Sequence, residues 1–245
     1  MKLLYTLLIG FVFHATLAAQ NSTPVEKREF RLLTTVGVIN ELKFDLTPKQ
    51  AVSVRIDSRL SQELPIPASG ALVLYREIAP PPDSPPGTKP VKETVAKIHF
   101  PQDYSKVIVV ISKNAATSGY QSLIFDDSEK SHPSGMLRLF NLSGMSTALS
   151  INKAVETVPP GKAQLVTYPL GPNNIQLAVQ RGSHWTIAFD KGRIARPNLR
   201  AHMFVFDYQK DPEIDDLGIP PPALVRFYTE SAPAIPPQGM SVTAR

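Results

Sequence analysis

Histidine is the side chain that most often serves as a general base and is a frequent metal ligand. Four histidines follow the first twenty residues: His99, His132, His184 and His202. No two of them have the i, i+4 or similar spacing by which neighbouring residues form a metal pair. We therefore expect separate surface or strand-end histidines without a catalytic or metal-binding role.

Carboxylates that alternate along a loop can bind calcium, and one short segment has this pattern. The stretch "DPEIDD" supplies a weak calcium candidate made of Asp211, Glu213, Asp215 and Asp216. Pro212 interrupts the segment, the sixth position is not glycine and the twelfth is Pro222. These departures favour a solvated loop. A weaker case is "FDDSE", which contains Asp126, Asp127 and Glu129.

Several other chemistries lack their sequence signatures. The chain contains no cysteine, which excludes disulfides, thiol catalysis and thiolate metal sites. It has no G-x-S-x-G elbow, no P-loop and no dinucleotide fingerprint, so we expect no cofactor and no enzymatic activity. A hydrolase whose site is assembled only in three dimensions remains an alternative.

A basic stretch around the single tryptophan is the remaining candidate for ligand binding. The stretch from Arg181 to Arg200 contains five cationic residues and a single acidic residue, Asp190. If the fold gathers the cationic side chains, they form a patch that attracts anions. Trp185, Ile187 and Phe189 share one parity, which predicts a core face, whereas an exposed Trp185 would stack on a sugar ring. The candidate ligand-binding residues are Arg181, His184, Trp185, Arg193 and Arg196.

The N-terminal segment predicts export. Residues 1–19 combine Lys2, an apolar run and small residues before Gln20, which is typical of a secretory signal peptide. We expect a protein of the bacterial periplasm, outer cell surface or extracellular space, without a transmembrane segment after cleavage. The formal net charge of +5 fits an envelope protein or an anionic polysaccharide as partner. Dispersed charge and export argue against nucleic acid.

The elements that must position these residues are short strands. In 41–46 Leu42, Phe44 and Leu46 alternate with charged residues, as in a half-buried strand, whereas "KVIVVIS" is apolar on both sides and indicates a central strand. We expect an all-β chain with a first β-sandwich domain at 20–132, containing a proline-rich loop at 79–91, and a second at 133–232. A disordered tail is expected at 233–245.

Three pairs of segments recur in the same order and suggest that one domain occurs twice. "FRLLTTVG" at 30–37 echoes "LRLFNLSG" at 137–144. The run from 52 to Tyr75 echoes the run from 148 to Tyr168, and 104–114 echoes 199–210. Each copy would hold about seven strands in about 100 residues, the size of an immunoglobulin-like sandwich.

The pattern "LRLFNLSG…ALSINK…VPPGKAQLVTY" resembles uncharacterised exported bacterial proteins with tandem immunoglobulin-like β-sandwich repeats. The resemblance covers mainly 136–180 and more faintly 30–80, and it carries no catalytic residue. It implies a non-catalytic envelope protein that is structural or binds other proteins; the alternative is a glycan-binding module. The stretch "LVLYREIAPPP" is similar to one in periplasmic pilus chaperones, but it comes too early in the chain; a chaperone-like role is a further alternative.

Overall fold

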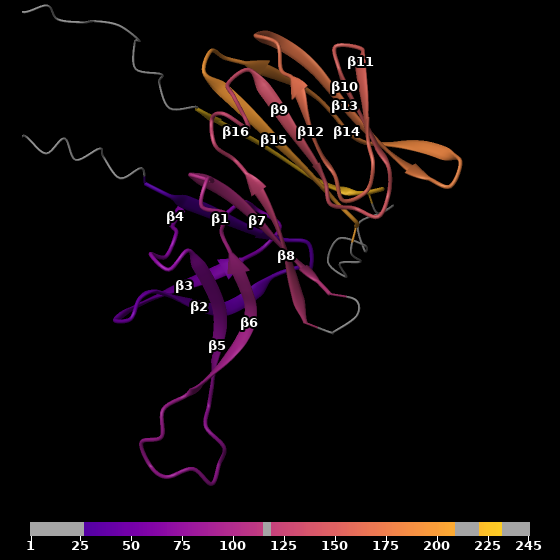
Figure 1. The fold of residues 1–245 in the computed structure, drawn as a ribbon. Coiled ribbons are helices and arrows are strands. Elements are labelled where there is room, and N and C mark those ends of the chain that lie inside the picture. The colour runs from indigo at the N-terminus through magenta and orange to yellow at the C-terminus, as the bar shows by residue number, and fades with distance from the viewer. Residues whose placement is uncertain (1–26, 115–118, 209–220, 232–245) are drawn as a thin grey trace, which may run out of the picture.

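The chain folds into β-strands, as a computed structural model shows for residues 27–114, 119–208 and 221–231. These residues form sixteen strands in four four-stranded sheets and contain no helix, hence none long and apolar enough to cross a membrane. The sheets pair into two β-sandwich domains, one above the other in Figure 1, which confirms the predicted all-β, two-sandwich fold. The expected signal peptide and C-terminal tail lie outside the described residues.

The first domain contains strands β1 to β8. One sheet has the order β4-β1-β7-β8, formed by Leu64–Pro65, Glu29–Thr34, Lys106–Lys113 and Tyr120–Asp126. The other has the order β3-β2-β5-β6, formed by Gln50–Ile56, Ile39–Thr47, Ala71–Ile78 and Val91–His99. The proline-rich loop connects β5 to β6, which pair with each other, so it lies within this domain.

The second domain repeats this topology strand for strand. The order β12-β9-β15-β16 is formed by Ala163–Thr167, Met136–Asn141, Leu199–Phe206 and Leu224–Ser231. The order β11-β10-β13-β14 is formed by Ala154–Val158, Thr147–Ile151, Gly171–Arg181 and His184–Ala195. The parallel pair β1–β7 has its counterpart in the parallel pair β9–β15. Each domain thus has eight strands, one more than expected.

Two of the three sequence echoes fall on equivalent strands. The first pair lies on β1 and β9, and the last pair lies on β7 and β15. The middle pair does not correspond, because Tyr75 lies in β5 whereas Tyr168 follows β12. The repeated strand order therefore supports one domain made twice, although the middle echo arose from the general likeness of short alternating strands.

Strand β7 is apolar on both sides because it separates two cores. Val107, Val109 and Ile111 pack into the core of the first domain. Ile108 and Val110 point the other way, into a buried cluster shared with the second domain. Successive side chains of a strand leave opposite faces, so one continuous apolar run serves both cores.

The two domains dock through the sheets that contain β1–β7 and β9–β15. Strand β15 mirrors β7: Met203 and Val205 fill the core of its own domain, while Phe204 and Phe206 face the first domain. The shared apolar cluster contains Leu33, Ile108, Val110, Phe140, Phe204 and Phe206, all almost fully buried. The molecule is thus four sheets deep (Figure 1), and a buried apolar cluster forms part of the contact between its domains.

Candidate functional site

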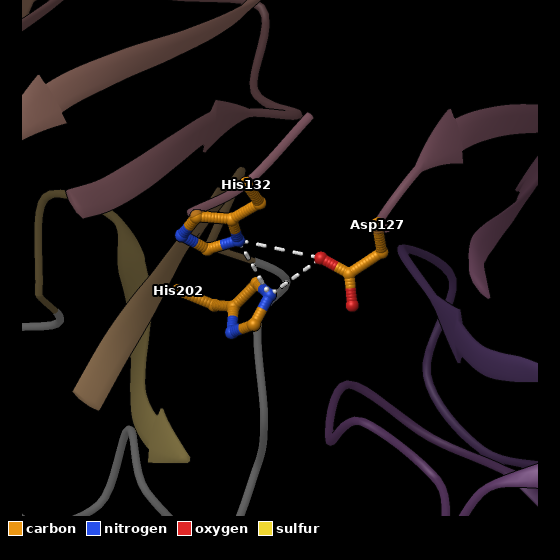
Figure 2. Close-up of side chains that lie close together, drawn as sticks. All are labelled: Asp127, His132 and His202. Atoms are coloured by element: carbon orange, nitrogen blue, oxygen red, sulfur yellow. Dashed lines mark hydrogen bonds and ion pairs between the residues drawn. The ribbon is translucent and has the colours of Figure 1, made fainter. Parts of the chain in front are cut away.

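Beside this apolar cluster, the domain boundary holds a buried polar cluster. Asp127 directly follows β8, His132 lies in the connection to β9, and His202 lies in β15. Figure 2 shows the Asp127 carboxylate approaching the two imidazole rings from the side of the first domain. All three side chains are at most 1% exposed. We take this cluster as the candidate functional site.

Three ligand-type atoms of the cluster face one another across short distances. His202 Nε2 lies 2.9 Å from Asp127 Oδ1 and 3.1 Å from His132 Nδ1. The third side of this triangle, between His132 Nδ1 and Asp127 Oδ1, is 3.3 Å long. On its far side the His132 ring points Nε2 at the Met136 carbonyl oxygen, 3.3 Å away. The three side chains therefore converge on a single point.

Arginines from both domains surround the triangle. Arg31 of β1 donates to Asp127 Oδ2 and to Glu230 of β16, and so bridges the domains. Arg200 of β15 donates to Asp127 Oδ2 at 3.2 Å, to Glu230, and to the backbone carbonyls of Asp127 and His132 at 2.8 and 3.3 Å. Two guanidinium groups are thus balanced by two carboxylates in the protein interior, which is how buried charges are tolerated.

The surroundings fix the charges of these groups. Burial by itself would raise the pKa of Asp127, but its contacts with the His132 and His202 rings and the charge of Arg200 hold that pKa far below its usual range. Burial lowers the pKa of His202 more than Asp127 raises it. For Glu230, burial opposes ionisation, yet the hydrogen bond and charge of Arg31 lower the pKa. The cluster therefore holds ionised carboxylates beside a neutral His202.

The arrangement is closed to substrates. A histidine beside a carboxylate is the pair that a hydrolase would use, but here neither group reaches solvent. A hollow lined by Asp127, Glu29, Arg31 and Lys106 has no room for a water molecule. The cluster is thus suited to holding the fold together or binding an ion, and it gives no support to the hydrolase alternative.

Sequence reasoning missed this cluster. His132 and His202 were expected at the surface or at strand ends, and both are fully buried instead. Asp127 and His202 are 75 residues apart and meet only because β15 packs against the first domain. One signal was present: Arg200, His202 and Phe204 share one parity in β15, which indicates a polar patch continuing an apolar face.

The structure corrects the predicted core position of Trp185. Trp185 is 45% exposed and Ile187 is 58% exposed, whereas Phe189 packs against the core of the second domain. The register explains the difference, because Leu177 pairs with Phe189 while Ala178 pairs with Ile187. This β-bulge inserts an extra residue into β14 and reverses the parity of the residues before it.

The candidate ligand-binding residues occupy two ends of one hairpin. Arg181 and His184 pair beside the turn between β13 and β14, next to Trp185, and Arg181 donates to the Pro222 carbonyl at 2.7 Å. Arg193 lies eight residues beyond Trp185, about 26 Å along an extended strand, and Arg196 follows the end of β14.

The predicted basic patch does not gather. Arg193 stacks on the rings of Phe189 and Phe227, 5.8 and 5.5 Å from their centroids. Arg200, which belonged to the same basic stretch, is buried at the domain boundary. Arg181, Arg193 and Arg200 therefore form separate local contacts in place of one shared patch.

The calcium candidates have different outcomes. Asp211, Glu213, Asp215 and Asp216 lie outside the described residues. In the weaker segment, Asp126 accepts hydrogen bonds from Ser128 and Ser131, while Glu129 accepts two from Ser134. Asp127 points instead into the buried histidine cluster. The three acidic side chains of that segment thus serve separate local contacts.

A search against protein-family models finds no family that matches this chain, and no curated protein matches its sequence.

Proposed function

We propose that this protein is an exported, non-catalytic bacterial envelope protein that recognises an extended segment of a protein partner along strand β14. The immunoglobulin-like character of its domains is part of the same proposal. The observation that carries it is the edge of β14 that pairs with no described strand, together with the exposed apolar side chains along it. Recognition would take the form of strand addition, in which a partner strand pairs with an exposed sheet edge.

Strand β14 combines length, a free edge and apolar side chains. It runs for twelve residues, and β13 is its one hydrogen-bonded neighbour among the described strands. Trp185, Ile187 and Ile194 are 45%, 58% and 69% exposed. Long apolar edge strands are normally covered or charged because their unpaired backbone groups bind other chains. A strand that keeps this combination is therefore suited to pairing with a partner.

A second long edge strand, β6, shows the usual protection. Strand β6 ends its sheet in the first domain and carries Lys92, Glu93 and Lys97 along nine residues. Lys92 is engaged by Asp45 at 2.7 Å and lies over the Tyr75 ring. Charges of this kind discourage a further strand from pairing. Strand β14 carries as many charges, Asp190, Lys191 and Arg193, but all of them follow Phe189, so the contrast points to residues 184–189 of β14 as the recognition edge.

A glycan-binding role is the second candidate, and the exposed Trp185 favours it. On the neighbouring strand β13, Gln180 pairs with Trp185, and Ala178 pairs with Ile187. Small and amide side chains beside an exposed indole suit stacking of a sugar ring. Trp185 serves either partner, so the experiment must separate protein from polysaccharide.

The chaperone-like alternative receives no such support. A hollow of about 360 Å³ lies between the domains, bordered by Lys113 and Gln121 of the first and by Leu142 and Asp207 of the second. Its one lysine is matched by one aspartate, so the hollow is not the basic cleft that a chaperone-like role requires.

Site-specific photo-crosslinking in the native cell tests the proposal. A photoreactive residue replaces Ile187 in one strain and Val91, at the edge of β6, in the matched control, where the wild-type side chain is 54% exposed. We expect a discrete protein adduct from position 187 and none from position 91. An Ile187→Lys substitution should reduce capture of that protein at least tenfold without changing the melting temperature, because the side chain is exposed.

Each other outcome argues against the proposal in a defined way. Equal adducts from both positions would show nonspecific proximity. An adduct of twice the chain mass would identify a second copy in place of a heterologous partner. Retention of polysaccharide by the wild type, lost on Trp185→Ala with no protein adduct at 187, would move the assignment to glycan binding.

A further inference from the structure

We propose that Asp127, His132 and His202 bind a divalent transition-metal ion, best matched by zinc, that ties the two domains together. The ligating atoms are Asp127 Oδ1, His132 Nδ1 and His202 Nε2. This site is independent of the recognition strand, which lies on the other sheet of the second domain. Its role is structural, because the site is closed to solvent.

The spacing of the three atoms suits a metal ion. Their separations are 2.9, 3.1 and 3.3 Å. In a tetrahedral zinc site with bonds of about 2.0–2.1 Å, neighbouring ligand atoms are about 3.3–3.4 Å apart. Each side of the triangle is therefore within a few tenths of an ångström of that value. Two imidazoles and one carboxylate are a donor set typical of zinc.

With a neutral His132, the atoms that face this triangle include more acceptors than hydrogens. His132 Nε2 faces the Met136 carbonyl, which only accepts, so Nε2 carries the hydrogen and Nδ1 presents a lone pair. The ionised Asp127 has no hydrogen either. His202 Nε2–H supplies one hydrogen to two acceptors, and its Nδ1 has no hydrogen-bond partner among the described residues. A metal ion would bind all three inward-facing atoms at once, with the His202 hydrogen then on Nδ1, for which no described residue provides an acceptor.

The residues around the triangle support metal binding. The Met136 carbonyl orients His132 as the carbonyl partner of a metal-bound imidazole normally does. Arg31 and Arg200 hold Asp127 through Oδ2, which leaves Oδ1 free to face the histidines. Glu230 Oε1 lies 3.9 Å from His202 Nε2 and accepts hydrogen bonds from Arg31 and Arg200, so it borders the site without being one of the three ligands.

The competing occupant is a second proton. A doubly protonated His132 would donate from Nδ1 to Asp127 and from Nε2 to Met136, and it would fit the same distances. The two occupants differ in what they leave behind on purification. Only the metal gives a stoichiometric element in the protein and a dependence of stability on chelators and added zinc.

Metal analysis of the purified full chain tests the proposal. The protein is prepared without chelator and its metal content measured by mass spectrometry, beside a His132→Gln/His202→Gln variant and an exposed-histidine control, His184→Gln. We expect about one zinc per chain in wild type and control and less than a tenth of that in the double variant. Zinc-free protein should melt about 5–10 °C below protein kept in free zinc at a hundred times the dissociation constant.

The variants are not essential to the outcome, because the wild type alone decides it. A wild-type chain that holds no metal after growth and purification in zinc, and whose melting temperature changes neither with zinc nor with chelator, would overturn the proposal. Equal zinc in a folded double variant would show an adventitious ion only. Cobalt in the place of zinc should give the visible absorption of a tetrahedral site, and octahedral absorption would contradict the geometry.

Discussion

The contact between the domains can be tested with two adjacent valines of β7. Val109 points into the core of the first domain and Val110 points into the cluster shared with the second domain. Both side chains are 0% exposed. Substituting each by alanine removes the same two methyl groups from neighbouring positions of one strand, so backbone propensity and chemistry are matched.

The expected cost follows from the buried groups. Two methyl groups at about 0.8 kcal/mol each, with a further term for the cavity that remains, give about 2–3 kcal/mol for either variant. At about 2–4 °C per kcal/mol for a chain of this size, either variant should melt about 4–12 °C below the wild type. If the interface is as dry and close-packed as a core, Val110→Ala should cost as much as Val109→Ala.

Differential scanning calorimetry provides the assay. Since the shared cluster couples the domains, we expect a single transition for wild type whose calorimetric and van't Hoff enthalpies agree. Both variants should shift that transition as a whole. A cost below about 0.5 kcal/mol for Val110→Ala beside a normal cost for Val109→Ala would refute the docking of the two sheets, because such a value is typical of surface sites.

Three further substitutions have defined consequences. Gly182 opens the β13–β14 turn at φ 59°, and a methyl group added there would meet open space, so Gly182→Ala should cost about 1–2 kcal/mol in urea unfolding through backbone strain alone. Buried Asn141 donates to two backbone carbonyls at 2.7 and 2.9 Å, so Asn141→Ala should cost about 2–4 kcal/mol, and a loss below about 1 kcal/mol would contradict those bonds. Hydrogen bonds from Lys92 and then Tyr75 lower the pKa of Asp45 in the folded protein. The ionised carboxylate therefore stabilises the fold above the pKa of the unfolded state, and this stabilisation is lost as the pH falls through the pKa of the folded state. In an NMR titration, Lys92→Met should therefore raise the pKa of Asp45 toward its ordinary value, and an unchanged pKa would contradict the pairing.

Local patterns predicted the strands well. Leu42, Phe44 and Leu46 alternate with charged residues, and all three lie in β2. Leu42 and Phe44 are fully buried there. The doubly apolar run of β7 predicted a central strand, although not that its second face would contact another domain. Side chains of a strand alternate strictly, so burial on each face is written directly into residue order.

Trp185 shows where that reasoning fails. Its parity with Phe189 predicted a core position, and one inserted residue between them exposed it. A β-bulge depends on how β14 pairs with β13, and neither strand alone specifies it. The recognition edge proposed for β14 was therefore invisible until the register was known.

The all-β class, the alternation of the strands and two of the three echoes between the halves can be predicted from residue order, because they depend on residues near one another in the chain. The meeting of Asp127, His132 and His202 cannot be predicted in this way. Two of these residues belong to the connection between the domains and the third to a strand some 70 positions later. Their encounter requires two sheets to dock face to face, and the free energy for that docking comes from apolar side chains elsewhere on the same faces.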